Sequence, residues 1–313
     1  MNIVLVAEQG AGLQALRAIS ESKHRLSLVL SSPPESSKNA ALWQASRQLG
    51  YDTRPASLVK TPEFALDLQR RAVDVIISVH SLYIVHPQVL TAARVGAFNL
   101  HPGPLPRYAG LNAVSWAIYR GENQFGVTLH WMSPEIDAGP IVFQSFFPIG
   151  LDDTALTLSY ACWREGLLLL RRLLDALSAG SLPSIPQDLS RREYLGGKVP
   201  NQGRIDWLWP ARNIYNFVRA CDFHPFPSPW GHPESTWRGE GMQILKASLS
   251  GLSCSIRPGI VGRVDESGAC VACGDEWLRL QNIAVCGRCV EAAAVLKSGD
   301  SLCASASPAR LSA

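Results

Sequence analysis

The sequence predicts an α/β fold, with a mostly parallel sheet in an N-terminal domain and a second, smaller domain that is rich in β-strands. Short apolar runs of β-forming residues recur over residues 1–150, and segments with helical periodicity separate them, which predicts the parallel sheet. From about Met242 onward, short β-rich runs follow one another, which predicts the small β domain.

Length and composition predict two domains. The chain has 313 residues, more than most single domains, and its 47% hydrophobic composition can fill a large core. We expect an α/β domain over residues 1–185, a linker and connecting helix over 186–240, and the β-rich domain over 241–313. A Pro/Ser-rich segment, residues 181–186, marks the first boundary.

The first strand is predicted over residues 1–7, and a glycine turn and a helix to about residue 20 follow it. Gly10 and Gly12 nominally match the G-x-G-x-x-A pattern of dinucleotide-binding proteins. However, the strand over 26–30 continues into Ser and Pro, residues 31–34, without the acidic residue that would bind an adenosine ribose. We therefore interpret the glycines as a turn that joins strand to helix.

The remaining elements of the first domain alternate as the fold class requires. An apolar run over residues 73–79 predicts a central strand, and residues 80–85 form the loop that follows it. A cap at Asp152, Asp153 and Thr154 begins a long amphipathic helix that ends near Gly180. Further helices are expected at 38–49, 62–71, 111–119 and 211–221, and further strands at 127–132 and 139–147.

Polar residues suited to catalysis follow two of these strands. Residues 95–98 predict a buried strand, so Asn99 and His101 emerge at its carboxyl end and point to the same face. Open α/β sheets bind ligands at that end. Asp137 lies in the turn-rich loop after the strand over 127–132. An amide donor, an imidazole and a carboxylate make a plausible acid/base and oxyanion site, provided that they meet in the fold.

These residues and their neighbours resemble the signature of the 10-formyltetrahydrofolate-dependent formyltransferases. The resemblance lies in Asn99-Leu100-His101, Leu105-Pro106, Gly110, the Gly126-Val127-Thr128 run and Ile136-Asp137-Ala138-Gly139, in matching order and spacing. It covers residues 1–180 well and the rest more weakly. The resemblance implies a Rossmann-like catalytic domain that binds folate, and a C-terminal domain that is barrel-like.

The resemblance also implies roles for individual residues. Asn99 and His101 would stabilise the oxyanion of a tetrahedral intermediate, and His101, oriented by Asp137, would assist proton movement. Neither a metal nor a covalent nucleophile is required. The implied contacts to the cosubstrate 10-formyltetrahydrofolate come from two loops, and comprise Tyr83, Ile84 and Val85 together with Ser133, Pro134, Glu135, Ile136 and Asp137.

Composition restricts the partners and the compartment. The net charge is +3 without a long Lys/Arg block, which does not favour a nucleic-acid partner, and no apolar run is long enough to span a membrane. The N-terminus has no basic leader, so we expect a cytoplasmic protein whose eight cysteines are reduced or bind metal. The sequence leaves the oligomeric state open.

The acceptor is expected to be a small-molecule primary amine, such as an amino acid, a peptide or a related intermediate of a specialised pathway. The basic insertion usual in methionyl-tRNA formyltransferases is missing after the second strand, and Leu111 occupies the place of an arginine found in some sugar-nucleotide enzymes. The aromatic and Pro-rich residues 222–231 resemble enzymes of secondary metabolism, with Phe223, Phe226 and Trp230 as an apolar rim.

Several alternative functions share the same signature. In order, they are a nucleotide amino-sugar N-formyltransferase, a methionyl-tRNA formyltransferase, and a formyltetrahydrofolate hydrolase in which water replaces the amine. A catalytically inactive folate-binding module is disfavoured because Asn99, His101 and Asp137 are all retained.

Four cysteines of the β-rich domain permit two interpretations. Cys270 and Cys273 form one C-x-x-C pair, and Cys286 and Cys289 form a second, with a spacing that suits a zinc ribbon. The same residues also fit ordinary strands in which buried free thiols replace apolar side chains. The spacing alone does not distinguish the two.

Overall fold

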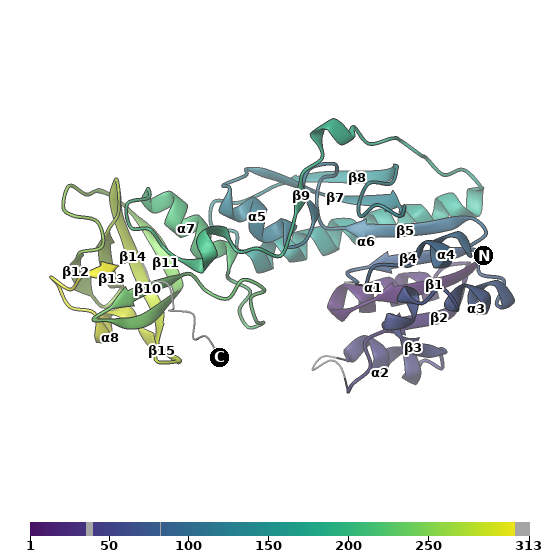
Figure 1. Cartoon of the computed structure of the whole chain (residues 1–313), viewed down its shortest axis with the longest axis horizontal. Coiled ribbons are helices and arrows are strands. Elements are labelled where there is room, and N and C mark those ends of the chain that lie inside the picture. Colours follow the sequence, from purple (N-terminus) through teal and green to yellow (C-terminus); the bar gives the residue numbers. More distant parts are fainter. Residues whose placement is uncertain (36–39, 82, 304–313) are drawn as a thin grey trace, which may run out of the picture. The chain divides into compact units, whose positions relative to one another are not determined.

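A computed structural model describes residues 1–35, 40–81 and 83–303 (Figure 1). The start of the helix expected at 38–49, Leu82 of the 80–85 loop and the end of the domain expected at 241–313 lie outside these ranges. The contacts divide the chain into two compact units. The first comprises residues 1–113, 124–148 and 159–195, and the second comprises 114–123, 149–158 and the chain from 196 onward. The domain boundaries expected at residues 185 and 240 stay predictions.

The first unit is built on a seven-stranded sheet with the order β3-β2-β1-β4-β5-β7-β8. The pairs from β3 to β5 are parallel, and β7 and β8 add an antiparallel edge. This arrangement confirms the predicted α/β class. The strands are β1 (Asn2–Ala7), β2 (Arg25–Ser31), β3 (Thr53–Pro55), β4 (Val75–Val79), β5 (Gly96–His101), β7 (Gln124–Trp131) and β8 (Ile141–Pro148).

Helices pack on both faces of this sheet. On one face, Leu68 of α3 and Val89 of α4 share a buried apolar cluster with Val4, Val6 and Ile76 of the strands. On the other face, α6 lies so close to β5 that a Cβ at Gly166 would be 2.8 Å from the side chain of Leu100. The helices of this unit are α1 (Gln9–Ser20), α2 (Ala41–Gln48), α3 (Phe64–Arg70), α4 (Pro87–Thr91) and most of α6 (Ala155–Ala179), whereas α5 (Ala113–Tyr119) belongs almost entirely to the second unit. None of the helices within the described ranges is long and apolar enough to cross a membrane.

The glycines after β1 lie in the first turn of α1. A Cβ at Gly12 would meet the Leu42 side chain at 2.7 Å and the Ala7 Cβ at 3.0 Å. Gly12 therefore has a structural role, the close packing of α1 against its neighbours, but the glycines lie inside the helix and do not form the turn that the sequence predicted.

Strand β5 is longer than the sequence predicted. The expected strand ended at Phe98, but the extended backbone continues to His101 because β7 pairs with residues 98–101 in antiparallel register. Asn99 and His101 therefore belong to the sheet itself and do not follow it. Asn99 is paired with β4 on one side and β7 on the other, and His101 is paired with β7.

The second unit contains a curled antiparallel sheet with the order β12-β13-β14-β11-β10-β16, and β15 pairs with β14. Val261 donates to the Asp300 carbonyl and Leu302 donates to the Gly259 carbonyl, both at 2.8 Å, which joins the two ends of the sheet. This curvature agrees with the predicted barrel-like domain. The strands are β10 (Glu234–Trp237), β11 (Glu240–Ser253), β12 (Val261–Asp265), β13 (Gly268–Ala272), β14 (Glu276–Val285), β15 (Arg288–Glu291) and β16 (Leu302–Cys303), with helices α7 (Ala211–Ala220) and α8 (Ala292–Val295).

The four cysteines of this sheet do not form a zinc ribbon. Cys270 on β13 pairs with Arg279 of β14, whereas Cys286 lies in the tight turn after β14 and Cys289 lies on β15, opposite Ala284. At the usual rise per residue of a strand, that turn lies roughly 20 Å from Arg279. All four thiols are free, and the described part of the chain contains no group of three or more His, Cys, Asp and Glu residues that could hold a metal. The zinc interpretation of the spacing is therefore wrong, because the two pairs lie near positions of β14 that are far apart.

The aromatic stretch at 222–231 is only partly exposed. Trp230 is 6% exposed and packs edge-on against Trp116 and Tyr119, with ring centroids 5.0 and 6.4 Å apart. Phe226 is 49% exposed. Trp230 is therefore a core residue of the second unit, and the expectation that it offers a stacking surface to the acceptor is wrong.

The return from β7 to β8 depends on a glycine. A Cβ at Gly139 would lie 1.9 Å from the carbonyl oxygen of Trp131, because the chain turns back closely enough for Trp131 to donate to the Pro140 carbonyl at 2.9 Å. Only glycine fits without movement of the backbone.

We expect Gly139→Ala to lower the free energy of unfolding by about 2 kcal/mol, because the added methyl group overpacks against backbone atoms. Urea unfolding measures this loss. Gly196→Ala is the control, since a Cβ there meets nothing within 4 Å. Equal stability of the two variants would contradict the packing described for Gly139.

Candidate active site

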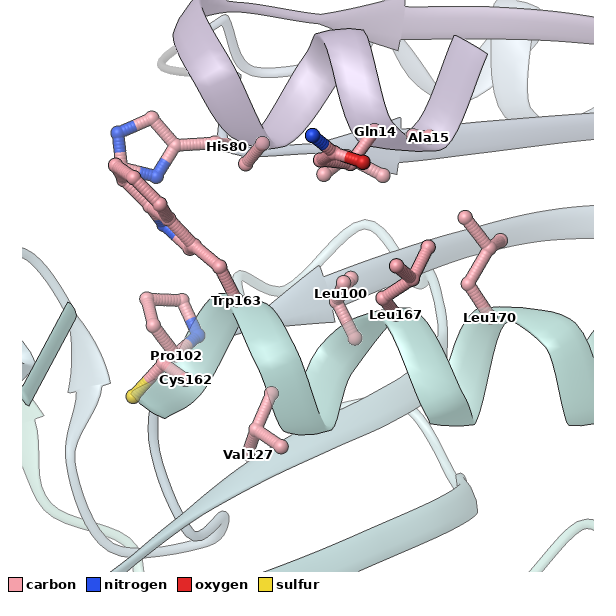
Figure 2. A pocket seen from close by; sticks show the side chains of 12 residues that line it. Gln14, Ala15, His80, Leu100, Pro102, Val127, Cys162, Trp163, Leu167 and Leu170 are labelled. Carbon is pink, nitrogen blue, oxygen red and sulfur yellow. The ribbon is translucent and has the colours of Figure 1, made fainter. Parts of the chain in front are cut away.

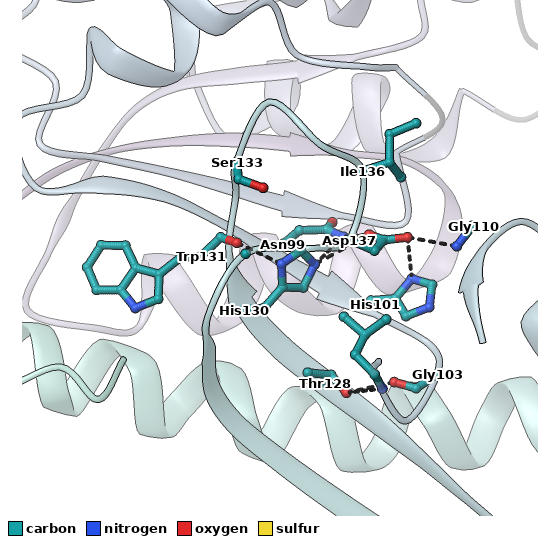
Figure 3. Close-up of polar contacts among 12 residues, drawn as sticks. Asn99, His101, Gly103, Gly110, Thr128, His130, Trp131, Ser133, Ile136 and Asp137 are labelled. Atoms are coloured by element: carbon teal, nitrogen blue, oxygen red, sulfur yellow. Dashed lines mark hydrogen bonds and ion pairs between the residues drawn. The ribbon is translucent and has the colours of Figure 1, made fainter. Parts of the chain in front are cut away.

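Three polar side chains of the site project from paired strands of the first unit (Figure 3). Asn99 and His101 alternate along β5 and therefore share a face. His130 of β7 lies directly opposite Asn99 in the antiparallel register. The Asn99 amide nitrogen is 3.2 Å from Nε2 of His130. The sheet thus presents an amide and two imidazoles side by side.

Asp137 joins these groups from the loop between β7 and β8. Its Oδ2 accepts a 2.9 Å hydrogen bond from the Gly110 amide and lies 3.5 Å from Nδ1 of His101. Its Oδ1 lies 3.4 Å from both the Asn99 amide nitrogen and Nε2 of His130. Figure 3 shows the carboxylate at the centre of these contacts. The structure therefore brings together the three residues that the sequence singled out, Asn99, His101 and Asp137.

Burial and charge set the protonation of this cluster. Burial alone would raise the pKa of the Asp137 carboxyl, but His101, His130 and the Gly110 amide together hold that pKa well below its usual value. Burial lowers the pKa of the His101 imidazole, and this effect outweighs the opposing influence of Asp137. The cluster therefore combines a carboxylate that stays ionised with an imidazole that readily gives up its proton.

Backbone carbonyls orient both imidazoles. Nε2 of His101 donates to the Tyr108 carbonyl at 2.7 Å, which in the neutral ring leaves Nδ1 unprotonated and facing Asp137. Nδ1 of His130 donates to the Trp131 carbonyl at 2.7 Å, which directs its Nε2 toward both the Asn99 amide nitrogen and the Asp137 carboxylate. A proton added to Nδ1 of His101 would point toward the Asp137 carboxylate.

The Pro-rich loop after β5 is tied to the sheet through Thr128. The Thr128 hydroxyl donates to the Gly103 carbonyl at 2.7 Å and accepts from the Leu105 amide at 3.1 Å. Gln144 of β8 donates to the same hydroxyl at 2.8 Å and to the Leu105 carbonyl at 3.0 Å. Gly103 is required here, since a Cβ would lie 2.7 Å from Nε2 of His101. These contacts hold the loop against the His101 ring.

The residues expected to contact folate lie in two loops of the same unit. Val85 is buried, and Tyr83 and Met132 pack against one shared apolar cluster, so the bases of the two loops share a core. Ile84 is 63% exposed. Ser133, Pro134, Glu135 and Ile136 precede Asp137 in the second loop, where the Ser133 hydroxyl donates to the Glu135 carbonyl at 2.9 Å. Their contacts to folate stay a prediction.

A small cavity lies on the opposite face of the sheet (Figure 2). Leu100 and Val127 line it from the strands, Trp163 and Leu167 line it from α6, and His80 packs edge-on against Trp163. Its volume of about 30 Å³ is sufficient for about one water molecule and far too small for a folate. We assign no ligand to it.

The sequence matches two models of one protein family. The model described as formyl transferase matches residues 2–170, and the model described as formyl transferase, C-terminal domain, matches residues 198–299. Together they cover well over half of the chain. The chain belongs to the formyltransferase family. The resemblance found in the sequence is thereby confirmed, and the protein is an enzyme of a family that uses 10-formyltetrahydrofolate as the formyl donor.

Solved structures with the same fold include two sugar-modifying relatives. An N-formyltransferase from Helicobacter canadensis, solved with folinic acid and dTDP-3-aminofucose, has a TM-score of 0.67 and 17% identity over 89% of this chain and 98% of its own. WlaRD, a sugar 3N-formyltransferase, has a TM-score of 0.68 and 17% identity over 91% of this chain and 97% of its own.

A third solved structure is longer than this formyltransferase. HypX from Aquifex aeolicus, solved with tetrahydrofolic acid, has a TM-score of 0.60 and 18% identity over 94% of this chain and 46% of its own. The chain therefore spans about half the length of HypX. At these identities the similarities establish the fold of the formyltransferase.

The sequence did not single out His130, although it lies within the site. Thr128 and His130 are polar residues at alternate positions of an apolar strand, which indicates that one face of β7 is functional. That signal could have identified them. Their positions opposite His101 and Asn99 depend on the register of β5 and β7, which is a long-range property.

We expect the contribution of Asp137 to stability to depend on pH. The folded-state pKa of its carboxyl lies below the unfolded value of 3.8, so its stabilising effect is complete above that value and is lost as pH falls below it. The difference in unfolding free energy between wild type and Asp137→Asn should be largest near about pH 7 and should shrink toward about pH 3. Urea unfolding over this range measures it, and a difference that does not change with pH would contradict the assignment.

Proposed function

We propose that this formyltransferase transfers the formyl group of 10-formyltetrahydrofolate to the primary amine of a small molecule. The observation that supports this most strongly is the buried Asp137 carboxylate in contact with both Asn99 and His101, in a chain that matches the family models. Such a cluster supplies a hydrogen-bond donor, a proton acceptor and a fixed negative charge, which are the groups that amide formation from an activated formyl donor requires.

The neutral amine attacks the formyl carbon, and the formyl oxygen becomes negatively charged in the tetrahedral intermediate. We assign the Asn99 amide to this oxygen. One of its two hydrogens is already bound to His130, whereas the other makes only a long, 3.4 Å contact with Asp137 and can turn to the substrate. A donor aimed at the developing oxyanion accelerates the reaction by roughly a hundredfold or more.

The attacking amine must lose a proton as the new C–N bond forms. Nδ1 of His101 carries no proton in its neutral tautomer, and the Asp137 carboxylate lies 3.5 Å away to stabilise the imidazolium. The imidazolium adds positive charge beside the oxyanion and then returns the proton to N10 as the C–N10 bond breaks. The products are the formamide and tetrahydrofolate, so no metal or redox partner takes part in these steps.

The folate donor is assigned to the edge of the sheet between the Tyr83–Val85 loop and the Ser133–Asp137 loop. Asn99 and His101 lie at the carboxyl end of β5, where parallel sheets bind ligands. The N-formyltransferase from Helicobacter canadensis was solved with folinic acid and HypX with tetrahydrofolic acid, which agrees with this choice of donor.

Two classes of small-molecule acceptor have support. The absence of an arginine at Leu111, which is 43% exposed, favours an amino acid, a peptide or a related amine over a sugar nucleotide. In contrast, of two relatives matched over nearly their whole length, one was solved with dTDP-3-aminofucose, and the other is a sugar 3N-formyltransferase solved with dTDP. We retain the amino acid or peptide as the first candidate and the nucleotide-linked amino sugar as the second.

We expect Asn99→Ala, His101→Ala and Asp137→Ala each to lower the rate of formyl transfer by about a hundredfold or more, because each removes a group that acts in the transition state. Release of tetrahydrofolate measures the rate. Thr91→Ala serves as the control, since its exposed hydroxyl donates only to carbonyls of its own helix, α4. Near-wild-type turnover of any of the three variants would refute the role assigned to that residue.

A competition assay tests the function and the acceptor together. Purified protein and 10-formyltetrahydrofolate are mixed with methionyl-tRNA, dTDP-3-aminofucose and a pool of amino acids and peptides, and the formylated product is identified by mass spectrometry. We expect a formylated amino acid or peptide. Formylation of the nucleotide sugar would select the second candidate, formylation of tRNA would refute a small-molecule acceptor, and formate alone would indicate a hydrolase.

A further inference from the structure

The segment after α6 lies beside both loops that carry the site. The sequence predicted a simple Pro/Ser linker beginning at Ser181, but residues 183–195, here called the bridging segment, belong to the first unit. They are bonded to the Asp137 loop at one end and to the loop that contains Gly110 at the other.

The bridging segment first fixes the Asp137 loop. Ile141 and Ile185 exchange two backbone hydrogen bonds, of 2.8 and 3.0 Å. The Gln187 side-chain amide donates to the carbonyl of Asp137 itself at 2.9 Å and to the Gly139 carbonyl at 2.6 Å. Both hydrogens of the Gln187 amide thus hold the backbone on either side of Ala138.

Arg192 fixes the same loop from its other side. Its guanidinium donates to the Ile136 carbonyl at 2.8 Å and lies 3.6 Å from the Glu135 carboxylate. The Arg192 side chain is 19% exposed, so these contacts are partly shielded from water. Gln187 and Arg192 therefore bind the carbonyl groups of two consecutive residues, Asp137 and Ile136.

These contacts act on a residue in an unfavourable backbone conformation. Asp137 has a φ of 54°, in the left-handed region that few residues other than glycine adopt. Such a conformation persists only when the surrounding contacts hold it. It directs the carboxylate toward His101 and Asn99. Without its carbonyl partners, the loop could relax and withdraw the carboxylate.

The other end of the bridging segment fixes the loop that faces His101. Strand β9 (Tyr194–Leu195) pairs in parallel with β6 (Ala109–Gly110). Ala109 donates to the Glu193 carbonyl at 2.9 Å, and Leu111 donates to the Leu195 carbonyl at 2.8 Å. The segment approaches so closely that a Cβ at Gly110 would lie 2.3 Å from the Leu195 carbonyl.

This second loop supplies two partners of the catalytic groups. Its Gly110 amide donates to Asp137, and its Tyr108 carbonyl accepts from His101. The bridging segment therefore holds both the loop that carries the Asp137 carboxylate and the loop whose backbone groups bond to Asp137 and His101.

We propose that Gln187 and Arg192 are positioning residues for formyl transfer, which set Asp137 against His101 and Asn99 through the backbone of its loop. This inference rests on the function proposed above for the same site. A displacement of about 1 Å in a reacting group can cost roughly a hundredfold in rate, so loss of either side chain should lower kcat far more than it changes substrate affinity.

The kinetic test uses Gln187→Leu, Arg192→Ala and Arg192→Lys in the full chain. We expect Gln187→Leu and Arg192→Ala to lower kcat by roughly tenfold to a hundredfold, with KM for 10-formyltetrahydrofolate changed less than about threefold. Arg192→Lys keeps a cation and a donor and should recover part of the rate. Arg191→Ala, a change at the neighbouring exposed arginine, is the matched control and should retain full activity. An effect on KM alone, or an equal loss in Arg191→Ala, would overturn the proposal.

A second measurement does not depend on activity. Hydrogen exchange is followed in the unliganded protein for the peptides that contain Gly110 and residues 133–139. We expect faster exchange there in Gln187→Leu and Arg192→Ala, at an unchanged melting temperature, and no change in Arg191→Ala. Unchanged exchange in the variants would overturn the positioning role, whether or not the wild type transfers a formyl group. If the variants show the expected exchange pattern but the wild type is inactive, only the proposed function is refuted.

Discussion

The structure around the site depends on one buried negative charge, the Asp137 carboxylate. A carboxylate removed from water is stable only with partners, and Asp137, at 9% exposure, contacts two imidazoles, the Asn99 amide and a backbone amide. Each of these partners is held by a further bond, since His101 donates to Tyr108 and His130 donates to Trp131. The positions of these side chains therefore depend on one another, so a movement of one residue would disturb the contacts of the others.

Two kinds of structure supply these partners, and they differ in rigidity. Asn99, His101 and His130 stand on paired strands, whose backbone hydrogen bonds fix their spacing. Asp137 and Gly110 stand on loops, which need other contacts to keep their positions. Thr128, Gly139 and the bridging segment provide these contacts at the places where the loops leave the sheet. A site held in this way is organised before the substrate binds, which is how preorganised dipoles lower a barrier.

In the second unit, two sequence patterns, the paired cysteines and the aromatic stretch, have structural surroundings that differ from those predicted. The two C-x-x-C pairs have a spacing that suits zinc, but an extended strand separates them, and three-dimensional proximity is what a metal requires. Trp230 lies in a Pro-rich stretch that the sequence predicted to be an exposed rim, but its ring packs in an aromatic cluster with Trp116 and Tyr119. In both cases the residue types suit the predicted role, but their surroundings in the fold do not.

The sequence by itself determined the alternation of strands and helices in the first unit, the β-rich character of the second, and the family. These follow from local periodicity and from motifs whose residues lie close together in the chain, such as Asn99 with His101 and Ile136 to Gly139. Only the tertiary structure decided that β5 extends to His101, that His130 faces Asn99, and that a predicted linker binds both catalytic loops. Each of these depends on pairing between segments far apart in sequence, and such pairing is set by the packing of the whole sheet, which local patterns do not encode.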